Sequence, residues 1–209
     1  MDPTKTLVQR FQEKAEAVSA VVKRVSSVRE TVDYVVDLCA GKEACQLLMA
    51  GCEAPLSGAA GDLCDAKQVK IIAAPGLPQK ELALLTEGCN AVGIRVTTDA
   101  LRDHLAGIDI GLTYADFGIA DTGTLVIDSR DEDIRLATMV SEIHVAVLPG
   151  SRLRETAYDV ETDLRDRMQQ APDYTAFITG ASRTADIERV LALGVHGPLE
   201  LHIVIREDA

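Results

Sequence analysis

Residues 108–128 read IDIGLTYADFGIADTGTLVID, and the spacing within this stretch decides which fold is expected. Two apolar runs, Ile108–Thr113 and Gly123–Asp128, have the length and the branched side chains that are typical of strands. The segment between them is too short to hold the crossover helix that joins parallel neighbours, so the two runs predict a hairpin. A hairpin among parallel strands predicts a mixed sheet.

Short strands and helices alternate on both sides of this stretch, which is typical of an α/β protein. Before it, the pattern predicts strands at Cys45–Ala50, Val69–Ala74 and Ile94–Thr97, and helices at Glu30–Ala40, Pro78–Cys89 and Asp99–Ala106. After it, the pattern predicts helices at Asp131–Met139 and Thr156–Gln170, and strands at Ile143–Leu148, Tyr174–Thr179 and Leu199–Ile205. Residues 51–68 are rich in turn formers and are expected to form the longest loop.

The N-terminus carries a different pattern. From Thr4 to about Val25, apolar residues follow three-and-four spacing, which indicates a long amphipathic helix. We therefore expect a helical extension at residues 1–26 and an α/β domain at residues 27–209. The sequence leaves open whether this helix packs on the domain or on a partner.

Composition narrows the classes of function. The chain has 209 residues and a formal net charge of −12, which repels phosphate backbones and anionic lipids, so nucleic acid and membrane insertion are not expected. No run approaches the roughly 18 apolar residues of a transmembrane helix, and the N-terminus does not read as a signal peptide, which predicts a cytoplasmic protein. The five cysteines include no C-x-x-C pair, so reduced thiols are expected and a metal or iron–sulfur site is not.

The stretch Thr179–Pro198 (TGASRTADIERVLALGVHGP) has the composition of a binding site. Its polar residues stand between glycines, which let a backbone approach a ligand closely. Arginine, hydroxyl and imidazole groups are donors suited to an anion. A plainer interpretation is a helix that is capped by Ser182 or Thr184 and runs to Leu193. Both interpretations are open, and His196 in particular favours a site.

A second candidate segment is Tyr114–Thr124 (YADFGIADTGT), in which two carboxylates stand five residues apart. Asp116 and Asp121 are suited to acid–base or nucleophilic work, although aspartate is also an ordinary turn residue. The Thr-Gly-Thr turn after Asp121 offers backbone N–H groups and two hydroxyls to an anion. By contrast, His144 and His202 lie inside apolar strands, where packing within the sheet is expected.

The blocks Ile119–Thr124 (IADTGT) and Gly180–Glu188 (GASRTADIE) resemble two motifs of the LUD domain family, formerly called DUF162, and in particular its lactate-utilisation C type. The resemblance covers about residues 20–206. The family usually has IAETGT and GPSRTADIE at these places. This chain therefore carries Asp121 where the family has a glutamate, and Ala181 where it has a proline.

The resemblance implies a three-layer α/β/α fold with a mixed, mostly parallel sheet. That fold is similar to the isomerase and CoA-transferase group, which includes glucosamine-6-phosphate deaminase and ribose-5-phosphate isomerase. The resemblance also implies a role in a three-part system that oxidises L-lactate to pyruvate. The iron–sulfur clusters of that system belong to partner subunits, so this chain is expected to bring no cofactor and no metal of its own.

We expect one pocket for a small carboxylate or another anion, formed by both motif segments. Arg183 would pair with the charge of the ligand, and His196 would move a proton, with Asp121 as a second candidate catalytic residue. The remaining candidates for ligand binding are Asp116, Thr122, Gly123, Thr124, Ser182, Thr184 and Asp186.

Two rival functions and the oligomeric state stay open. One rival is a self-sufficient enzyme, similar to CoA transferases or phosphosugar isomerases, that uses Asp121 as nucleophile or base. The other is a non-catalytic assembly or regulatory subunit that docks through the N-terminal helix. The sequence is compatible with a homo-oligomer in each case.

Overall fold

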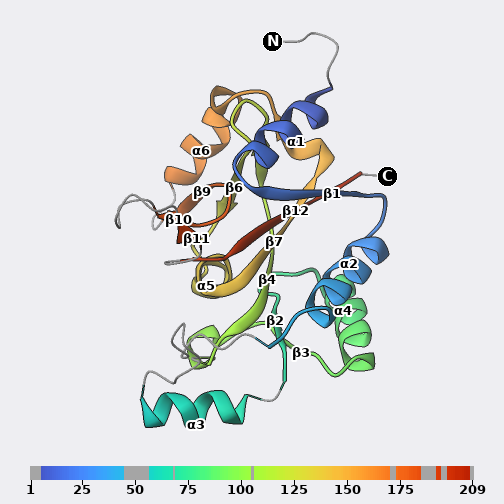
Figure 1. The fold of residues 1–209 in the computed structure, drawn as a ribbon. Helices are drawn as coiled ribbons and strands as arrows, with labels where there is room; N and C mark the ends of the chain where they lie inside the picture. Colours follow the sequence, from blue (N-terminus) through green and yellow to red (C-terminus); the bar gives the residue numbers. More distant parts are fainter. Residues whose placement is uncertain are drawn as a thin grey trace.

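The computed structural model describes residues 6–44, 57–67, 69–104, 106–169, 173–184, 192–193 and 197–207. Its centre is a sheet of six strands, here called the large sheet, in which all paired strands run parallel. The spatial order is β1 (Ala20–Val25), β12 (Glu200–Arg206), β7 (Ser141–Pro149), β4 (Ile108–Tyr114), β2 (Ile71–Ala73) and β3 (Arg95–Thr97). In Figure 1 the sheet crosses the molecule from β1 above to β3 below.

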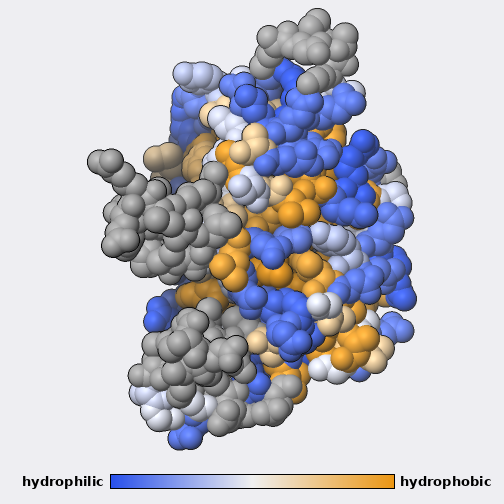
Figure 2. Space-filling model, viewed as in Figure 1, coloured by the Kyte–Doolittle hydropathy of each residue, from blue (hydrophilic) through white to orange (hydrophobic). Residues whose placement is uncertain are grey.

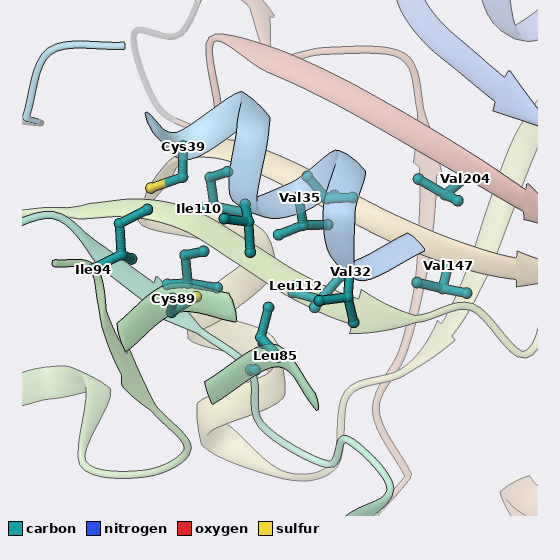
Figure 3. Packing of buried hydrophobic residues seen from close by; sticks show 14 of the residues in the cluster. Val32, Val35, Cys39, Leu85, Cys89, Ile94, Ile110, Leu112, Val147 and Val204 are labelled. Carbon is teal, nitrogen blue, oxygen red and sulfur yellow. The ribbon is translucent and has the colours of Figure 1, made fainter. Parts of the chain in front are cut away.

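One face of the large sheet is covered by α2 (Val28–Ala40) and α4 (Gln79–Ala91). Figure 3 shows Val35 of α2 and Leu85 of α4 packed toward Ile110 of β4. All three side chains are fully buried, which removes their apolar surface from water and stabilises this layer.

The opposite face packs against α1 (Leu7–Ala17), α5 (Glu132–Met139) and a second sheet. Phe11 of α1 is fully buried in the same cluster as Leu148 of β7. Ala137 of α5 packs in a separate cluster with residues of β2 and β4. Because both faces are covered, the strands of the large sheet read as nearly continuous apolar runs.

The second sheet, here called the small sheet, has four strands and mixed directions. Its order is β8 (Leu153–Arg154), β5 (Phe117–Ile119), β6 (Thr124–Asp128) and β9 (Thr175–Thr179). β5 and β6 form an antiparallel hairpin, β9 pairs antiparallel to β6, and β8 pairs parallel to β5.

The two faces of the small sheet differ in what they contact. Leu125 points to the inner face and joins the cluster around α1, whereas its neighbour Val126 points to the outer face. On the outer face Val126 packs with Phe117, and Leu164 of α6 (Glu161–Met168) covers them. The small sheet therefore presents one face to the domain core and the other to α6.

The N-terminal prediction of one long helix is wrong beyond Ala17. A capping box between Thr6 and Gln9 starts α1, but the helix ends at Ala17 and Ser19 adopts a positive φ of 69°. Residues 20–25 then form β1, paired in parallel with β12. The valines with helical spacing also suit a strand, and pairing with a distant strand decides the outcome.

The single mixed sheet predicted from the hairpin is also wrong. The predicted hairpin between Ile108–Thr113 and Gly123–Asp128 does not form, because Phe117–Ile119 is an additional strand and takes the place of β4 as the antiparallel partner of β6. β4 stays in the large sheet with parallel neighbours on both sides. The chain thus changes sheets within three residues of Tyr114, which leaves the large sheet all-parallel and the small sheet mixed.

Most other predicted elements are present, with ends shifted by a few residues. Two predictions are wrong: Gly58–Ala66 is helix α3 inside the expected loop, and the helix expected at 99–106 is only a 3-10 turn, Leu101–Asp103. The strand predicted at Cys45–Ala50 lies outside the described residues.

Hydrophobic residues also reach the surface. Figure 2 shows them as patches between hydrophilic residues on the viewed face. Val21 of the edge strand β1 is 46% exposed, and Phe177 of the edge strand β9 is 53% exposed. Both sheets therefore end in an edge strand with an exposed apolar side chain.

Candidate functional site

A cavity of about 320 Å³ lies between α5 and β9, on the inner face of the small sheet. This volume is at the lower end of the range usual for ligand pockets, about 300–1,000 Å³. Its apolar lining comes from Met139, Ala176, Ile178, Ala181, Pro198 and Leu201. Its polar lining comes from Ser129, Arg135, Thr138, His144, Tyr174 and Ser182, and Gly180 and Gly197 complete it.

Arg135, on α5, is the cation of the cavity. Its Nη1 donates a 2.7 Å hydrogen bond to the carbonyl of Ser129, and its Cζ lies 4.8 Å from the ring centroid of Tyr174. No carboxylate of the described residues lies within ion-pair distance of it. The guanidinium is thus held in place by a carbonyl and an aromatic ring, neither of which cancels its charge.

Ser182 brings a hydroxyl to the same cavity. Its backbone N–H donates to the carbonyl of Pro198 at 3.2 Å, which ties this segment to the start of β12. The hydroxyl makes no hydrogen bond within the described part of the chain, unlike those of Ser129 and Thr138, which donate to backbone carbonyls. Ser182 is therefore a donor that a ligand in the cavity can use.

His144, on β7, lines the cavity from the large sheet. Its ring is 1% exposed, and Nε2 lies 2.9 Å from the hydroxyl of Thr113. Burial lowers the pKa of His144 to about 4, so the imidazole is neutral at physiological pH. The histidine packs in the sheet, as expected from the sequence, and also offers a neutral hydrogen-bonding edge to the cavity.

The rest of the second motif begins and ends at this cavity, because Ser182 and Gly197 both line it. Arg183–Thr184 forms the short strand β10, which pairs antiparallel with β11 (Ala192–Leu193). Those two strands contradict a helix that starts at Ser182 and runs to Leu193. Asp186 and His196 lie outside the described residues, as do the side chains of Arg183 and Thr184.

The first motif lies beside the second in the small sheet. Thr124 of β6 is in register with Thr179 of β9, and their hydroxyl oxygens are 2.7 Å apart. The hydroxyl of Thr122 lies 2.7 Å from that of Thr124, so three threonines form one chain of hydrogen bonds. Asp121 and Thr122 are exposed, and Asp121 donates its backbone N–H to the carbonyl of Glu155.

Two glycines bring these motifs against the C-terminal end of α1. Gly123 has a φ of +67°, and a Cβ there would lie 2.4 Å from the backbone nitrogen of Ala15. Gly180 has a φ of +75°, and a Cβ there would lie 2.1 Å from the carbonyl oxygen of Val18. Both positions exclude a side chain, so glycine is required for the contact with α1 and its turn.

Asp116 lies away from the cavity, at the start of the small-sheet hairpin. Its Oδ2 accepts a 2.6 Å hydrogen bond from the backbone N–H of Asp128, and its Oδ1 forms a 3.0 Å ion pair with Arg167 of α6. The carboxylate thus joins the hairpin to α6.

The structure brings the two motif segments together at Thr124 and Thr179, but of the predicted site residues whose side chains it describes, only Ser182 lines the cavity. Asp116, Asp121, Thr122, Gly123 and Thr124 are absent from its lining. Sequence reasoning missed Arg135 and Tyr174. Arg135 stands in an acidic, amphipathic helix and reads as a solvent-exposed residue, so its sequence carries no signal of the cavity.

Other chemistry is limited in the described residues. Cys39 and Cys89 are free and buried, and burial raises the pKa of Cys39 to about 12 and that of Cys89 to about 11, so both stay protonated thiols. No group of three metal-ligating side chains occurs in the described ranges. Among the helices of those ranges, none combines the length and the apolar character needed to cross a bilayer.

The sequence model of the LUD domain matches residues 8–205 of this chain. Lactate utilization protein C of Halalkalibacterium halodurans is 34% identical over 103 residues, which cover 48% of this chain and 45% of that protein. The protein of the same name from an Exiguobacterium species is 34% identical over 114 residues, which cover 53% and 49%. The chain spans about half the length of the curated relatives it matches.

A solved structure shares the fold. The crystal structure of a DUF162 family protein from Deinococcus radiodurans superposes with a TM-score of 0.59 and covers 96% of both chains. The identity between them is 17%, so this likeness concerns the fold alone.

Proposed function

The chain belongs to the LUD domain family, and on that premise we propose that it is a cluster-free subunit of an iron–sulfur system that oxidises L-lactate to pyruvate. In this proposal it binds a small carboxylate in the cavity between α5 and β9. Distant homology to lactate utilization protein C supports the choice of system. Iron–sulfur subunits would be its partners.

One observation carries the ligand class: the guanidinium of Arg135 faces an apolar cavity and has no carboxylate partner among the described residues. A guanidinium binds a carboxylate through two parallel hydrogen bonds, and the apolar walls strengthen the attraction by excluding water. The protein's net charge of −12 repels anions in general, so an anion that binds this chain needs a local cation such as Arg135.

The other polar groups of the cavity suit a hydroxy acid. The Ser182 hydroxyl is a donor and an acceptor, and the neutral His144 ring can hydrogen-bond to a second group of the ligand without adding charge. Oxidation of lactate releases two electrons and two protons. In the proposal the electrons pass to the iron–sulfur subunits, and this chain binds and orients the substrate or the product.

The predicted residues of the second motif keep a place in this proposal. Arg183, Thr184, Asp186 and His196 belong to the segment that starts at Ser182 and ends at Gly197, both of which line the cavity. Arg183 would add a second charge for the carboxylate, and His196 would move a proton. Replacing any of these four residues by glutamine is expected to lower the lactate-dependent reduction of a dye by the complex reconstituted with its partner subunits.

The test is Arg135→Gln, which removes the charge and keeps a shorter, polar side chain. We expect L-lactate and pyruvate binding, measured by calorimetric titration, to weaken about tenfold to a hundredfold, because hydrogen bonds to charged groups contribute about 1.5–3 kcal/mol. Lactate-dependent reduction of a dye by the complex reconstituted with its partner subunits should fall in parallel.

Arg165→Gln is the matched control, because Arg165 is 65% exposed on α6 and pairs only with Glu161 among the described residues. It should behave as the unaltered protein. Equal binding of lactate and pyruvate by Arg135→Gln and the unaltered chain would show that the cavity is not the carboxylate site.

A further inference from the structure

Three arginines converge on one aromatic ring on the outer face of the small sheet. The guanidinium carbons of Arg152, Arg154 and Arg167 lie 5.8, 5.2 and 5.8 Å from the ring centroid of Phe117. All three distances are within the range of cation–π attraction, about 6 Å, so the ring holds the cations near one another. They come from the turn after β7, from β8 and from α6.

This arginine cluster is separate from the cavity around Arg135. Phe117 belongs to the outer-face cluster with Val126, and the cavity is lined by the inner-face residues Ala176 and Ile178 of β9. The cluster follows the carboxyl ends of β7 and β4, since Arg152 and Phe117 each lie three residues beyond them. Ligands of α/β proteins commonly bind beyond the carboxyl ends of parallel strands.

The cationic charge of the cluster is only partly neutralised. Asp116 pairs with Arg167 at 3.0 Å, whereas Arg152 and Arg154 have no ion pair within the described ranges. Arg154 donates from Nη1 to the carbonyls of Ser151 and Leu153. Asp128 and Asp159 also act electrostatically on Arg167 and Arg154, so carboxylates offset part of the cluster's charge, while Arg152 has no ion pair among the described residues.

Arg167 also has an unsatisfied hydrogen-bond donor among the described residues. Its Nη1 atom is buried and has no hydrogen-bond partner among the described residues, although its other terminal nitrogen pairs with Asp116. Buried donors in native proteins are nearly always satisfied by protein, water or a bound ion. An anion at the cluster would lower the electrostatic cost of burying this guanidinium.

We propose that Arg152, Arg154 and Arg167 form a binding site for a phosphate group. All three guanidinium carbons lie within 5.8 Å of one ring centroid, so the cluster is compact and suits a small anion better than an extended acidic segment. A phosphate has enough acceptor oxygens for several guanidinium forks at once, while a carboxylate has two. The phosphate is either free or carried by a small molecule such as a nucleotide.

The probes are inorganic phosphate, pyrophosphate and AMP, titrated calorimetrically into the whole protein in a chloride buffer at constant ionic strength. Arg152→Gln/Arg154→Gln is the informative variant, because both side chains reach solvent and Arg167 keeps its pair with Asp116. We expect at least one probe to bind the unaltered chain. The affinity of the double variant for that probe should be lower by at least about tenfold.

The control variant is again Arg165→Gln, which removes a cation from the same helix, two residues from Arg167, and should bind as the unaltered chain. Tightest binding of inorganic phosphate supports a site for the free ion, and tightest binding of AMP supports a phosphate carried by a nucleotide. The proposal is overturned if no probe binds, if the double variant binds equally well, or if citrate competes as well as phosphate does.

Discussion

The central strands of the large sheet and the edge strand β9 of the small sheet differ in how completely they are buried. The central strands β4, β7 and β12 are buried along almost their whole length, between α2 and α4 on one side and α1 and α5 on the other. In the edge strand β9, no residue is fully buried. The central strands of the large sheet therefore contribute more apolar stabilisation than β9, although β5 and β6 of the small sheet are buried as well. The small sheet places polar groups beside a cavity on one face and beside α6 on the other.

The largest expected effect tests this difference in stability. Ile110→Ala, in β4, should lower the free energy of unfolding by about 2–5 kcal/mol, because Ile110 is fully buried and its loss leaves a cavity in the core. Phe177→Ala, in β9, removes a larger side chain that is 53% exposed, and should cost less than about 1 kcal/mol.

Urea unfolding of both variants measures the contrast. The dependence of the free energy on urea concentration should stay unchanged, so that the shift in midpoint reports stability alone. A loss at Phe177 as large as that at Ile110 would mean that the edge strand β9 contributes to stability as much as the central strand β4.

A second effect depends on pH and originates in the large sheet. Burial lowers the pKa of His144 to about 4, against about 6.5 in an unfolded chain. Above pH 6.5 both states are neutral and the stability is complete. Between pH 6.5 and 4 the unfolded state takes up a proton that the folded state does not, so stability falls as pH falls, by at most about 3 kcal/mol.

The contribution of the small sheet to stability should be lost in a lower pH range. A hydrogen bond from Arg130 holds the pKa of Asp128 below its usual value of 3.8, so its contribution is lost only in stronger acid. Urea unfolding at a series of pH values should show a decline between 6.5 and 4 that is absent in His144→Gln. An identical decline in that variant would assign the effect to other groups.

The sequence predicts the helices and strands of this fold better than it predicts which strands pair with one another. Runs such as Ile143–Leu148 have enough β-branched residues to be recognised as strands, and β7 contains them. Residues 20–25 were predicted as helix because their valines continue the spacing of α1. What makes them a strand is pairing with β12, which is far away in the sequence.

The candidate site shows the same limit: its local chemistry is predictable from the sequence, but the residues that meet in it are not. Ser182 was predicted from local chemistry and lies in the cavity. Arg135, His144 and Tyr174 join it from α5, β7 and the residue before β9, and only folding brings these segments together. Asp116 was predicted as a ligand residue, but its observed partners are Arg167 and the backbone of Asp128. A local sequence pattern shows that a residue is polar, but it does not show on which face of a sheet the side chain lies.

The smallest expected effect concerns Ser182 itself. Ser182→Ala should weaken lactate or pyruvate binding about fivefold, because a neutral hydrogen bond contributes about 1 kcal/mol, less than the charged bonds of Arg135. The free energy of unfolding should change by less than about 0.5 kcal/mol, since the hydroxyl has no partner within the described residues and the bond from the backbone N–H to Pro198 remains. Calorimetric titration and urea unfolding separate these two results. If stability fell while binding stayed constant, Ser182 would act in packing β9 against β12, and the assignment of the cavity to binding would rest on Arg135 alone.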